Sequence, residues 1–526
     1  MRSCAALIVF LAAPEVPWAA GYVGSGVCAS CHRETALGYA KSAMGRSLMP
    51  IPVELMDRLL PRPASVFSPR WQRTYEVRRD GSNTLQTMSQ RGPEGSLLFT
   101  LSYPLRYVVG SGVNGYTFLV ERDGFLFEAP LSYYTRPGRW DLSPGYEDAD
   151  IGFNRRVDPA CVACHAGRLD SGFAGTGRFK EKPFEEAAIA CETCHGPGGE
   201  HVKGNTSAIV NPRKLEARRG EDICMRCHQD GHARVLLPGK TWDDFRPGEP
   251  LSQTLAILAA PGVPPTDQVL LQHHSAMKGS RCFQASQGRL SCFSCHTIHA
   301  RSNYREACLA CHAGSHSGAP SLQSGDCANC HMPKRSTQTI SHAALTDHRI
   351  PRDSGQPPLL ANTGSDFSAL DPITAILAYG QLAARWPEAL SRYRNILRAN
   401  SARLAEDPRS AAALARDLMS RSTKEADAQA SQLFLFASTA PPDARIWVDW
   451  AEVLTRLGRG AEALRTLEIG LSRASYEPAL HKALALHKLS NGDGTGAHAV
   501  LRNYLAVFPE DAAARELASQ LRESLR

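Results

Sequence analysis

Seven copies of one short pattern, Cys-x-x-Cys-His, run through the chain and constrain its fold more than any other feature. The copies use fourteen of the sixteen cysteines and leave only Cys4 and Cys282 outside the pattern. Their cysteines are Cys28, Cys31, Cys161, Cys164, Cys191, Cys194, Cys224, Cys227, Cys292, Cys295, Cys308, Cys311, Cys327 and Cys330. The histidines that close them are His32, His165, His195, His228, His296, His312 and His331.

The spacing of this pattern suits one chemistry. Two thiols three residues apart reach the two vinyl groups on one edge of a porphyrin, and the next imidazole then lies beneath the ring and binds the iron. Zinc sites and redox Cys-x-x-Cys pairs do not need a histidine at that offset. The repetition therefore predicts seven covalently bound haem c groups, with the fourteen cysteines as anchors and the seven motif histidines as iron ligands.

The formal net charge of +7 could indicate an acidic or nucleic-acid partner. Each haem, however, adds two propionates that the ferric iron offsets only in part, so seven haems would remove roughly seven positive charges. The charge therefore gives no reason to expect a nucleic-acid partner.

The N-terminus predicts export. Arg2 precedes an apolar stretch over 5–13, and small residues stand at Ala19 and Ala20, as in a Sec-type signal peptide over 1–20. The alternative is a buried N-terminal helix. Thioether attachment of haem takes place outside the bacterial cytoplasm, which favours a periplasmic protein. No other segment approaches the run of about 20 apolar residues that a membrane helix needs, so we expect no membrane span in the mature protein.

The rest of the chain consists of segments that differ in composition. Strand-like segments with hairpin signals at Asp80-Gly81 and Asp123-Gly124 predict a small antiparallel β module. Beyond the motifs, alanine and leucine dominate, and two units of just over thirty residues, ending near Pro478 and Pro509, are typical of tetratricopeptide repeats. An unspecific helical bundle is the alternative. The predicted parts are a first haem-binding segment (21–65), a β-rich insertion (66–150), a six-haem region (151–350), a linker (351–366) and a helical-repeat domain (367–526).

The predicted fold class is therefore multidomain. It combines a mainly α multihaem cytochrome c with short helices and long loops, the small antiparallel β insertion, and a C-terminal all-α solenoid of tetratricopeptide type.

Each iron needs a sixth ligand or an open face. Eight histidines outside the motifs lie in the haem region, which is enough to give every iron a second imidazole and low-spin coordination. His201, His299, His342 and His348 are the strongest candidates, because they closely follow motifs. For His232, His273, His274 and His316, a ligand role and a surface position are equally favoured. Met44 is a candidate sixth ligand for the first haem, against a core methionine, and Cys282 is either a buried free thiol or a thiolate beside an open haem.

Several segments carry a family resemblance. They are Gly24 to His32, Cys191 to His201, Ser280-Arg281-Cys282 before Leu290-Ser291-Cys292, and Cys330 to Lys334 followed by Thr346-Asp347-His348. Through them, residues 22–350 resemble the cytochrome c-552/c-554 family, in versions fused to tetratricopeptide repeats. The resemblance implies a periplasmic electron carrier with stacked haems and mostly bis-histidine ligation. In the family pattern the first haem's helix offers a histidine, and the matching stretch here, Ser42-Ala43-Met44, favours Met44.

Two functions remain open. The first is electron transfer between a redox protein donor and acceptor, with the helical repeats docking a protein partner and no catalytic residue. The second is a multihaem oxidoreductase that acts on a small nitrogen or sulfur compound at one five-coordinate haem. The histidine supply favours the electron carrier over the enzyme.

Overall fold

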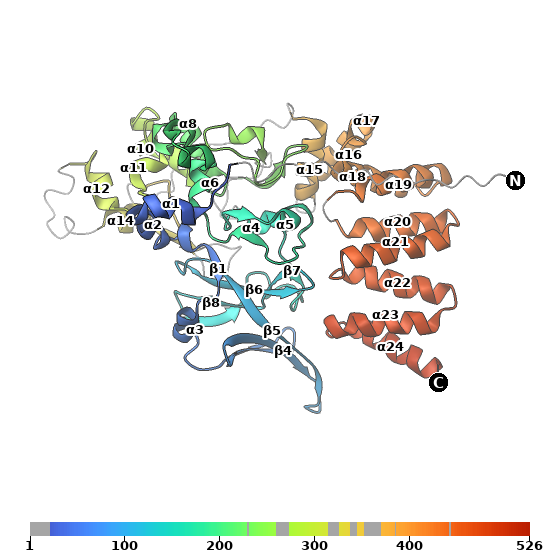
Figure 1. Ribbon diagram of the computed structural model, residues 1–526. Helices are drawn as coiled ribbons and strands as arrows, with labels where there is room; N and C mark the ends of the chain where they lie inside the picture. The colour runs from blue at the N-terminus through green and yellow to red at the C-terminus, as the bar shows by residue number, and fades with distance from the viewer. Residues whose placement is uncertain are drawn as a thin grey trace.

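The computed structural model describes residues 21–228, 231–258, 273–313, 326–336, 344–351, 370–383, 386–440 and 443–525. Three parts are visible in Figure 1: short helices that carry the motifs, an antiparallel sheet below them, and a stack of longer helices beside both. The predicted signal peptide, Cys4, and all but the first residue of the predicted linker lie outside the described residues.

Ten strands form one antiparallel sheet between the first and second motifs. They are β1 (Leu48–Pro50), β2 (Ala64–Ser68), β3 (Arg73–Asp80), β4 (Asn83–Arg91), β5 (Leu97–Val109), β6 (Gly115–Arg122), β7 (Phe125–Glu128), β8 (Leu131–Tyr134), β9 (Arg139–Leu142) and β10 (Arg155–Arg156). The order is β10-β7-β6-β5-β4-β3-β2, with β1 beside β5 and β8 joining β6 to β9. Strand β5 pairs with β4 through its first part and with β6 through its second, and the register shifts between Leu105 and Tyr107. A register shift of this kind bends a strand and lets one sheet curve.

Both predicted hairpins are present, joining β3 to β4 and β6 to β7. Asp123 and Gly124 both have positive φ, as a two-residue type I′ turn requires.

The fold-class prediction of a mainly α cytochrome part with a small β insertion is wrong. The sheet has ten strands and extends beyond both ends of the predicted insertion, because β1 and β10 pair with strands far away in sequence. Antiparallel strand pairs also lie among the motifs. They are β11 (Arg168–Leu169) with β12 (Phe184–Glu186), β13 (Ala233–Leu236) with β14 (Leu255–Leu258), and β15 (Lys334–Ser336) with β16 (Ala344–Thr346).

Short helices carry or flank the motifs, and one of them, α3 (Val53–Leu59), packs against the sheet instead. They are α1 (Ser25–Cys31), α2 (Arg33–Ala40), α3 (Val53–Leu59), α4 (Pro159–Val162), α5 (Ser171–Thr176), α6 (Cys191–His195), α7 (Gly199–Val202), α8 (Ala217–Met225), α9 (His273–Gly279), α10 (Arg281–Ala285), α11 (Cys292–Cys295), α12 (Tyr304–Leu309) and α14 (Cys327–His331). Single 3₁₀ turns are η1 (Met44–Arg46), η2 (Thr206–Ala208), η3 (Pro212–Lys214) and η4 (Leu251–Gln253). One helical turn places both thiols of a motif on the same face, since residues three apart are neighbours on a helix surface.

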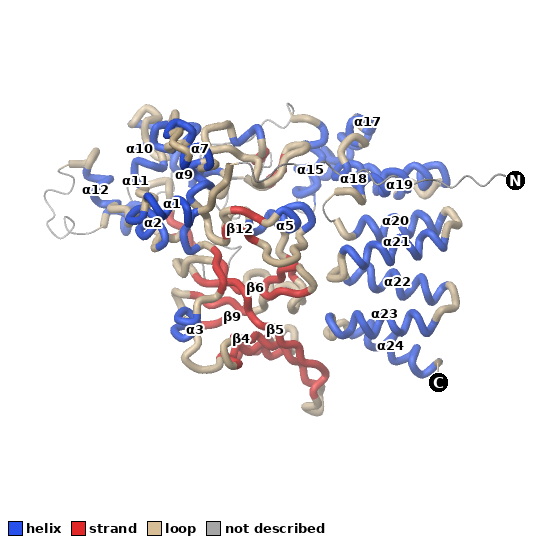
Figure 2. The backbone as a smooth tube through the Cα atoms, viewed as in Figure 1, coloured by secondary structure: helices blue, strands red, loops and turns tan. Residues whose placement is uncertain are grey.

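The C-terminal part is a stack of helix pairs, best followed in Figure 2. It contains α15 (Pro372–Ala383), α16 (Pro387–Ala399), α17 (Ser401–Leu404), α18 (Pro408–Met419), α19 (Lys424–Ala437), α20 (Arg445–Arg456), α21 (Gly460–Arg473), α22 (Pro478–Ser490), α23 (Gly494–Val507) and α24 (Ala512–Ser524). Helices α20, α22 and α24 begin at residues 445, 478 and 512, which is close to the 34-residue period of tetratricopeptide repeats.

One hydrophobic core joins the sheet to this stack. It contains Val77 and Phe118 from the sheet, Trp447 and Leu467 from the helices, and Tyr476 from the turn between α21 and α22. A second core lies within the stack around Phe434. No helix in the described part of the chain combines the length and the apolar character that crossing a membrane requires.

Candidate functional site

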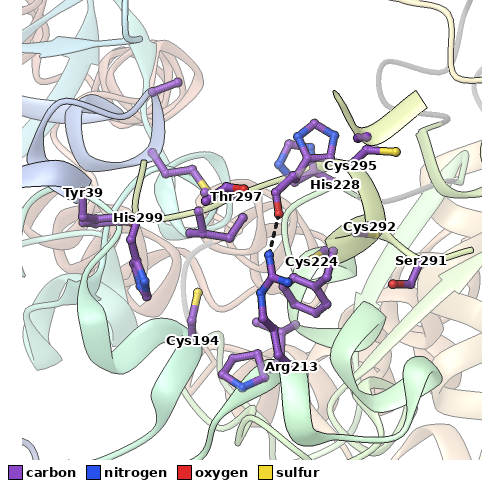
Figure 3. Close-up of a pocket in the computed structure, with 18 of the residues that line it drawn as sticks. Tyr39, Cys194, Arg213, Cys224, His228, Ser291, Cys292, Cys295, Thr297 and His299 are labelled. Carbon is purple, nitrogen blue, oxygen red and sulfur yellow. Dashed lines mark hydrogen bonds between the residues drawn. The ribbon is translucent and has the colours of Figure 1, made fainter. Parts of the chain in front are cut away.

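A cavity of about 2470 Å³ runs between the motif helices, and the close-up in Figure 3 shows part of its lining. Cysteines and histidines of six motifs line it, from Cys28 of the first to His331 of the last. Pockets for one small molecule usually measure about 300–1,000 Å³. The cavity therefore has room for several large ligands held side by side.

Three motif histidines each face a second histidine across this cavity. The pairs, with the distance between ring centroids and the angle between ring planes, are His32 with His201 (6.3 Å, 18°), His195 with His299 (5.9 Å, 17°) and His296 with His348 (6.2 Å, 21°). An imidazole nitrogen binds a metal at about 2.0 Å, so two imidazoles on opposite sides of one metal have centroids about 6 Å apart. The separation in all three pairs fits a shared iron.

The fourth motif has a similar partner. The ring of His228 lies 5.7 Å from that of His273, with the planes at 72°. The neighbouring His274 is held elsewhere, because its Nε2 lies 3.0 Å from a carboxylate oxygen of Glu221. Of the two adjacent histidines, His273 is thus the one that can face the motif. Its Nδ1 also lies 2.8 Å from Nδ1 of His348, which brings the fourth and fifth motifs together.

Backbone carbonyls orient two of the motif imidazoles. Nδ1 of His195 lies 2.7 Å from the carbonyl of Val210, and Nδ1 of His331 lies 3.1 Å from the carbonyl of Pro351. A carbonyl can only accept, so Nδ1 must carry the proton and Nε2 is left as the ligand atom. The buried Nδ1 of His201 has no hydrogen-bond partner among the described residues.

Burial favours the neutral, metal-binding form of several histidines. It lowers the pKa of His165, His296 and His299, and together with the neighbouring His348 it lowers the pKa of His273 to about 3. These imidazoles are therefore uncharged at neutral pH. The cluster has the chemistry of an iron-ligand set.

Comparison with known proteins agrees with this geometry. No family model matches the chain. The multihaem cytochrome MtrA of Shewanella baltica is 25% identical over 241 residues, which cover 42% of this chain and 68% of MtrA. The chain is homologous to multihaem cytochromes. The resemblance to multihaem cytochromes stated from the motifs is thereby confirmed, and covalently bound haem c is the group that the paired cysteines and histidines would hold.

Two further comparisons match smaller parts of this chain. Cytochrome c-554 of Nitrosomonas europaea is 34% identical over 87 residues, so the chain spans only 35% of that relative and the match covers 14% of this chain. A solved structure of the APC/C hetero-tetramer Cut9-Hcn1 aligns with a TM-score of 0.25 and 19% identity, over 29% of this chain and 30% of that one. That score is too low to support a statement about fold.

The motifs are neighbours in space. Among the described residues, thiols of different motifs are close neighbours in four places: Cys28 with Cys191, Cys164 with Cys227, Cys224 with Cys292, and Cys308 with Cys327. The first motif thus lies beside the third, the second beside the fourth, the fourth beside the fifth, and the sixth beside the seventh. Groups bound at these motifs would be closely spaced.

The second motif is the exception to the cavity arrangement. Its residues are not among those that line the cavity, and Ser47 donates to the backbone carbonyl of His165 at 2.6 Å. Within the described residues, no second imidazole is in ring contact with His165. The sixth position at this motif is therefore not assigned to a histidine.

The other predicted ligands differ in whether the structure describes them and in whether they line the cavity. His316 and His342 lie outside the described residues. His232 packs on Trp386, with ring centroids 5.2 Å apart, and does not line the cavity. Met44 does line the cavity, but the ring that faces His32 is that of His201. Cys282 also lines the cavity, and burial raises the pKa of its thiol, which favours the neutral form.

Three residues that hold this site together were not found from the sequence. The buried carboxylate of Glu192 accepts hydrogen bonds from the backbone N–H groups of Val23, Gly24 and Gly198. The Tyr39 hydroxyl donates to the carbonyl of Ile189 at 2.8 Å. Arg213 donates to the carbonyl of His296 at 3.4 Å, as the dashed line in Figure 3 shows. Nothing in their local sequence marks these roles, because every partner except Gly198 is far away along the chain.

Gly38 provides a test that changes no ligand. It lies on α2 so close to the backbone of His299 that a Cβ would overlap the His299 carbonyl oxygen. We expect Gly38→Ala to displace His299 and to weaken low-spin coordination at the third motif, measured by electron paramagnetic resonance of the oxidised protein. Gly26→Ala, on α1 with open space at its Cβ position, is the matched control and should leave the spectrum unchanged. Equal spectra for the two variants would contradict the placement of His299.

Proposed function

We propose that the protein is a periplasmic heptahaem c-type cytochrome that transfers electrons from a donor protein to an acceptor protein. The observation that carries the proposal is the set of near-parallel imidazole pairs with centroids 5.9–6.3 Å apart around one continuous cavity. Homology to multihaem cytochromes supports the same function. From the sequence we further propose a Sec-type signal peptide over 1–20, a linker over 351–366, and His342 as the remaining distal ligand.

The chain's own residues explain why such sites would carry electrons. Covalently held haem supplies reversible one-electron chemistry at iron. His201, His299 and His348 would each hold the group together with a motif histidine, which would leave no place there for a substrate. Because both imidazoles belong to the protein, little rearrangement would accompany a change of charge on that group. The lining of the cavity is mostly apolar, so it would lower the polarity around groups held between the motifs.

Spectroscopy of the holoprotein tests this proposal. We expect the oxidised protein to give mainly low-spin ferric signals, and the reduced protein to bind much less than one carbon monoxide per haem. We also expect seven electrons per chain in a reductive titration spread over a broad range of potentials. High-spin signals from most of the irons would overturn the proposal.

One observation supports the alternative of an oxidoreductase. His165 has no second imidazole in ring contact within the described residues, so the second motif could present an open coordination position. An oxidoreductase would turn over a small nitrogen or sulfur compound. The compound would also perturb a high-spin signal of the wild type that the variant His165→Met lacks. These two results together would replace the electron-carrier proposal with the oxidoreductase. If such compounds leave every signal unchanged, the electron carrier stands.

A further inference from the structure

The helix stack contacts the cytochrome part beside the second motif. The guanidinium of Arg156 lies 4.6 Å above the ring of Tyr476, and the ring of Phe125 lies 4.9 Å from the same tyrosine. Arg156 also forms an ion pair with Asp158, the residue that immediately precedes α4. Since α4 carries Cys161, the contacts run continuously from the helix stack to the second motif.

A separate contact reaches the strand that follows the fourth motif. The side-chain amide of Gln381, on α15, accepts from the N–H of Arg234 at 3.0 Å and donates to its carbonyl at 2.9 Å, as a neighbouring strand would. Arg409, on α18, donates to the carbonyl of Leu236 at 3.1 Å. Both partners belong to β13, which begins five residues after His228.

The second and fourth motifs, which flank these two contacts, lie against each other. The thiol of Cys164, in the second motif, donates to the backbone carbonyl of Arg226, inside the fourth motif, at 3.8 Å. The same stack of helices therefore contacts the flanks of both the second and the fourth motif. Tyr476 is 8% exposed and belongs to the core shared with the sheet, so this face of the stack is covered by the protein itself.

We propose that the helix stack is an internal brace that fixes the second motif against the fourth, with Tyr476 and Arg156 as the contact at one end and Gln381 and Arg409 at the other. The covered face around Tyr476 is consequently not a docking surface for another protein. The inference goes beyond electron transfer and rests on the proposed function only in placing haem groups at these two motifs.

Substitution of Tyr476 in the holoprotein tests the brace. Tyr476→Ala removes the ring beneath Arg156, and we expect amide hydrogen exchange over 155–165 to quicken about thirtyfold, the effect of losing one desolvated cation–π contact. The same variant should change the resonance signals of the second and fourth haems and leave those of the others unaltered. Tyr476→Phe is the matched control, because the hydroxyl is buried without a hydrogen-bond partner among the described residues and the ring is retained.

A second variant covers the case in which Tyr476→Ala does not fold. Gln381 is exposed, so Gln381→Ala should fold and should quicken exchange over 231–236 while leaving 155–165 unchanged. If Tyr476→Ala folds and matches Tyr476→Phe in exchange and in spectra, or if Gln381→Ala matches the wild type over 231–236, the brace is refuted. Hydrogen exchange reports on the contacts whether or not the haems pass electrons, so a failure of the proposed function is distinguished from a failure of the brace.

Discussion

Replacing His201 by alanine should convert one haem of the oxidised protein from low spin to high spin, and the reduced variant should bind about one carbon monoxide per chain. The reason is that His201 supplies the ring that faces His32 at 6.3 Å, so its loss opens one axial position. His201→Met should restore low-spin coordination and raise that haem's potential, because a thioether ligand favours the reduced iron.

His232→Ala is the matched control for this experiment. His232 lies in the same region of the chain but packs on Trp386 outside the cavity lining, so its removal should leave the spin state unchanged. An unaltered low-spin spectrum in His201→Ala would mean that another residue binds the iron of the first motif. Adding Met44→Leu to that variant would then show whether Met44, the ligand predicted from the sequence, takes the position.

Glu192→Ala should cause the largest loss of stability among the substitutions considered. The Glu192 carboxylate is 6% exposed and accepts from Val23 N at 2.9 Å and from the N–H groups of Gly24 and Gly198 at 2.8 Å each. Hydrogen bonds to a charged group contribute about 1.5–3 kcal/mol each, so losing all three should cost on the order of 4 kcal/mol or more. Chemical denaturation of the holoprotein measures this loss directly.

The same substitution should alter the contact between the first and third motifs. Residues 23–24 lead directly into α1, and Glu192 lies inside the third motif, so the carboxylate ties the two together. We expect the circular dichroism signal that arises from coupled haems to decrease. Glu186→Ala removes a single bond, to Ser25 N at 2.9 Å, and should have about one third of the effect on stability. A loss in Glu192→Ala no larger than in Glu186→Ala would contradict this role.

Local patterns in the sequence predicted the local features of the molecule well. The Cys-x-x-Cys-His spacing is complete within five residues, and Asp123-Gly124 forms its turn without help from distant residues. The histidine pairs could be predicted only in part. A histidine that closely follows one motif was expected to serve a neighbour, and the structure places His201 beside the first motif, but sequence distance could not say which neighbour.

Features that depend on distant partners were missed. The strands β1 and β10 have three and two residues, too few to show an alternating pattern, and their pairing partners lie elsewhere in the chain. The size of the sheet was underestimated for that reason. The interpretation of Met44 as a candidate sixth ligand, which stays a prediction, did not include a similar long-range fact, namely that α7 brings His201 back to α1 over a separation of about 170 residues.

Anomalous diffraction at the iron absorption edge from crystals of the mature holoprotein would test the central claim most directly. The account predicts seven iron positions, each beside one Cys-x-x-Cys-His motif, with single irons between His32 and His201, between His195 and His299, and between His296 and His348. Irons absent from these three positions, or irons isolated from one another by protein, would contradict it.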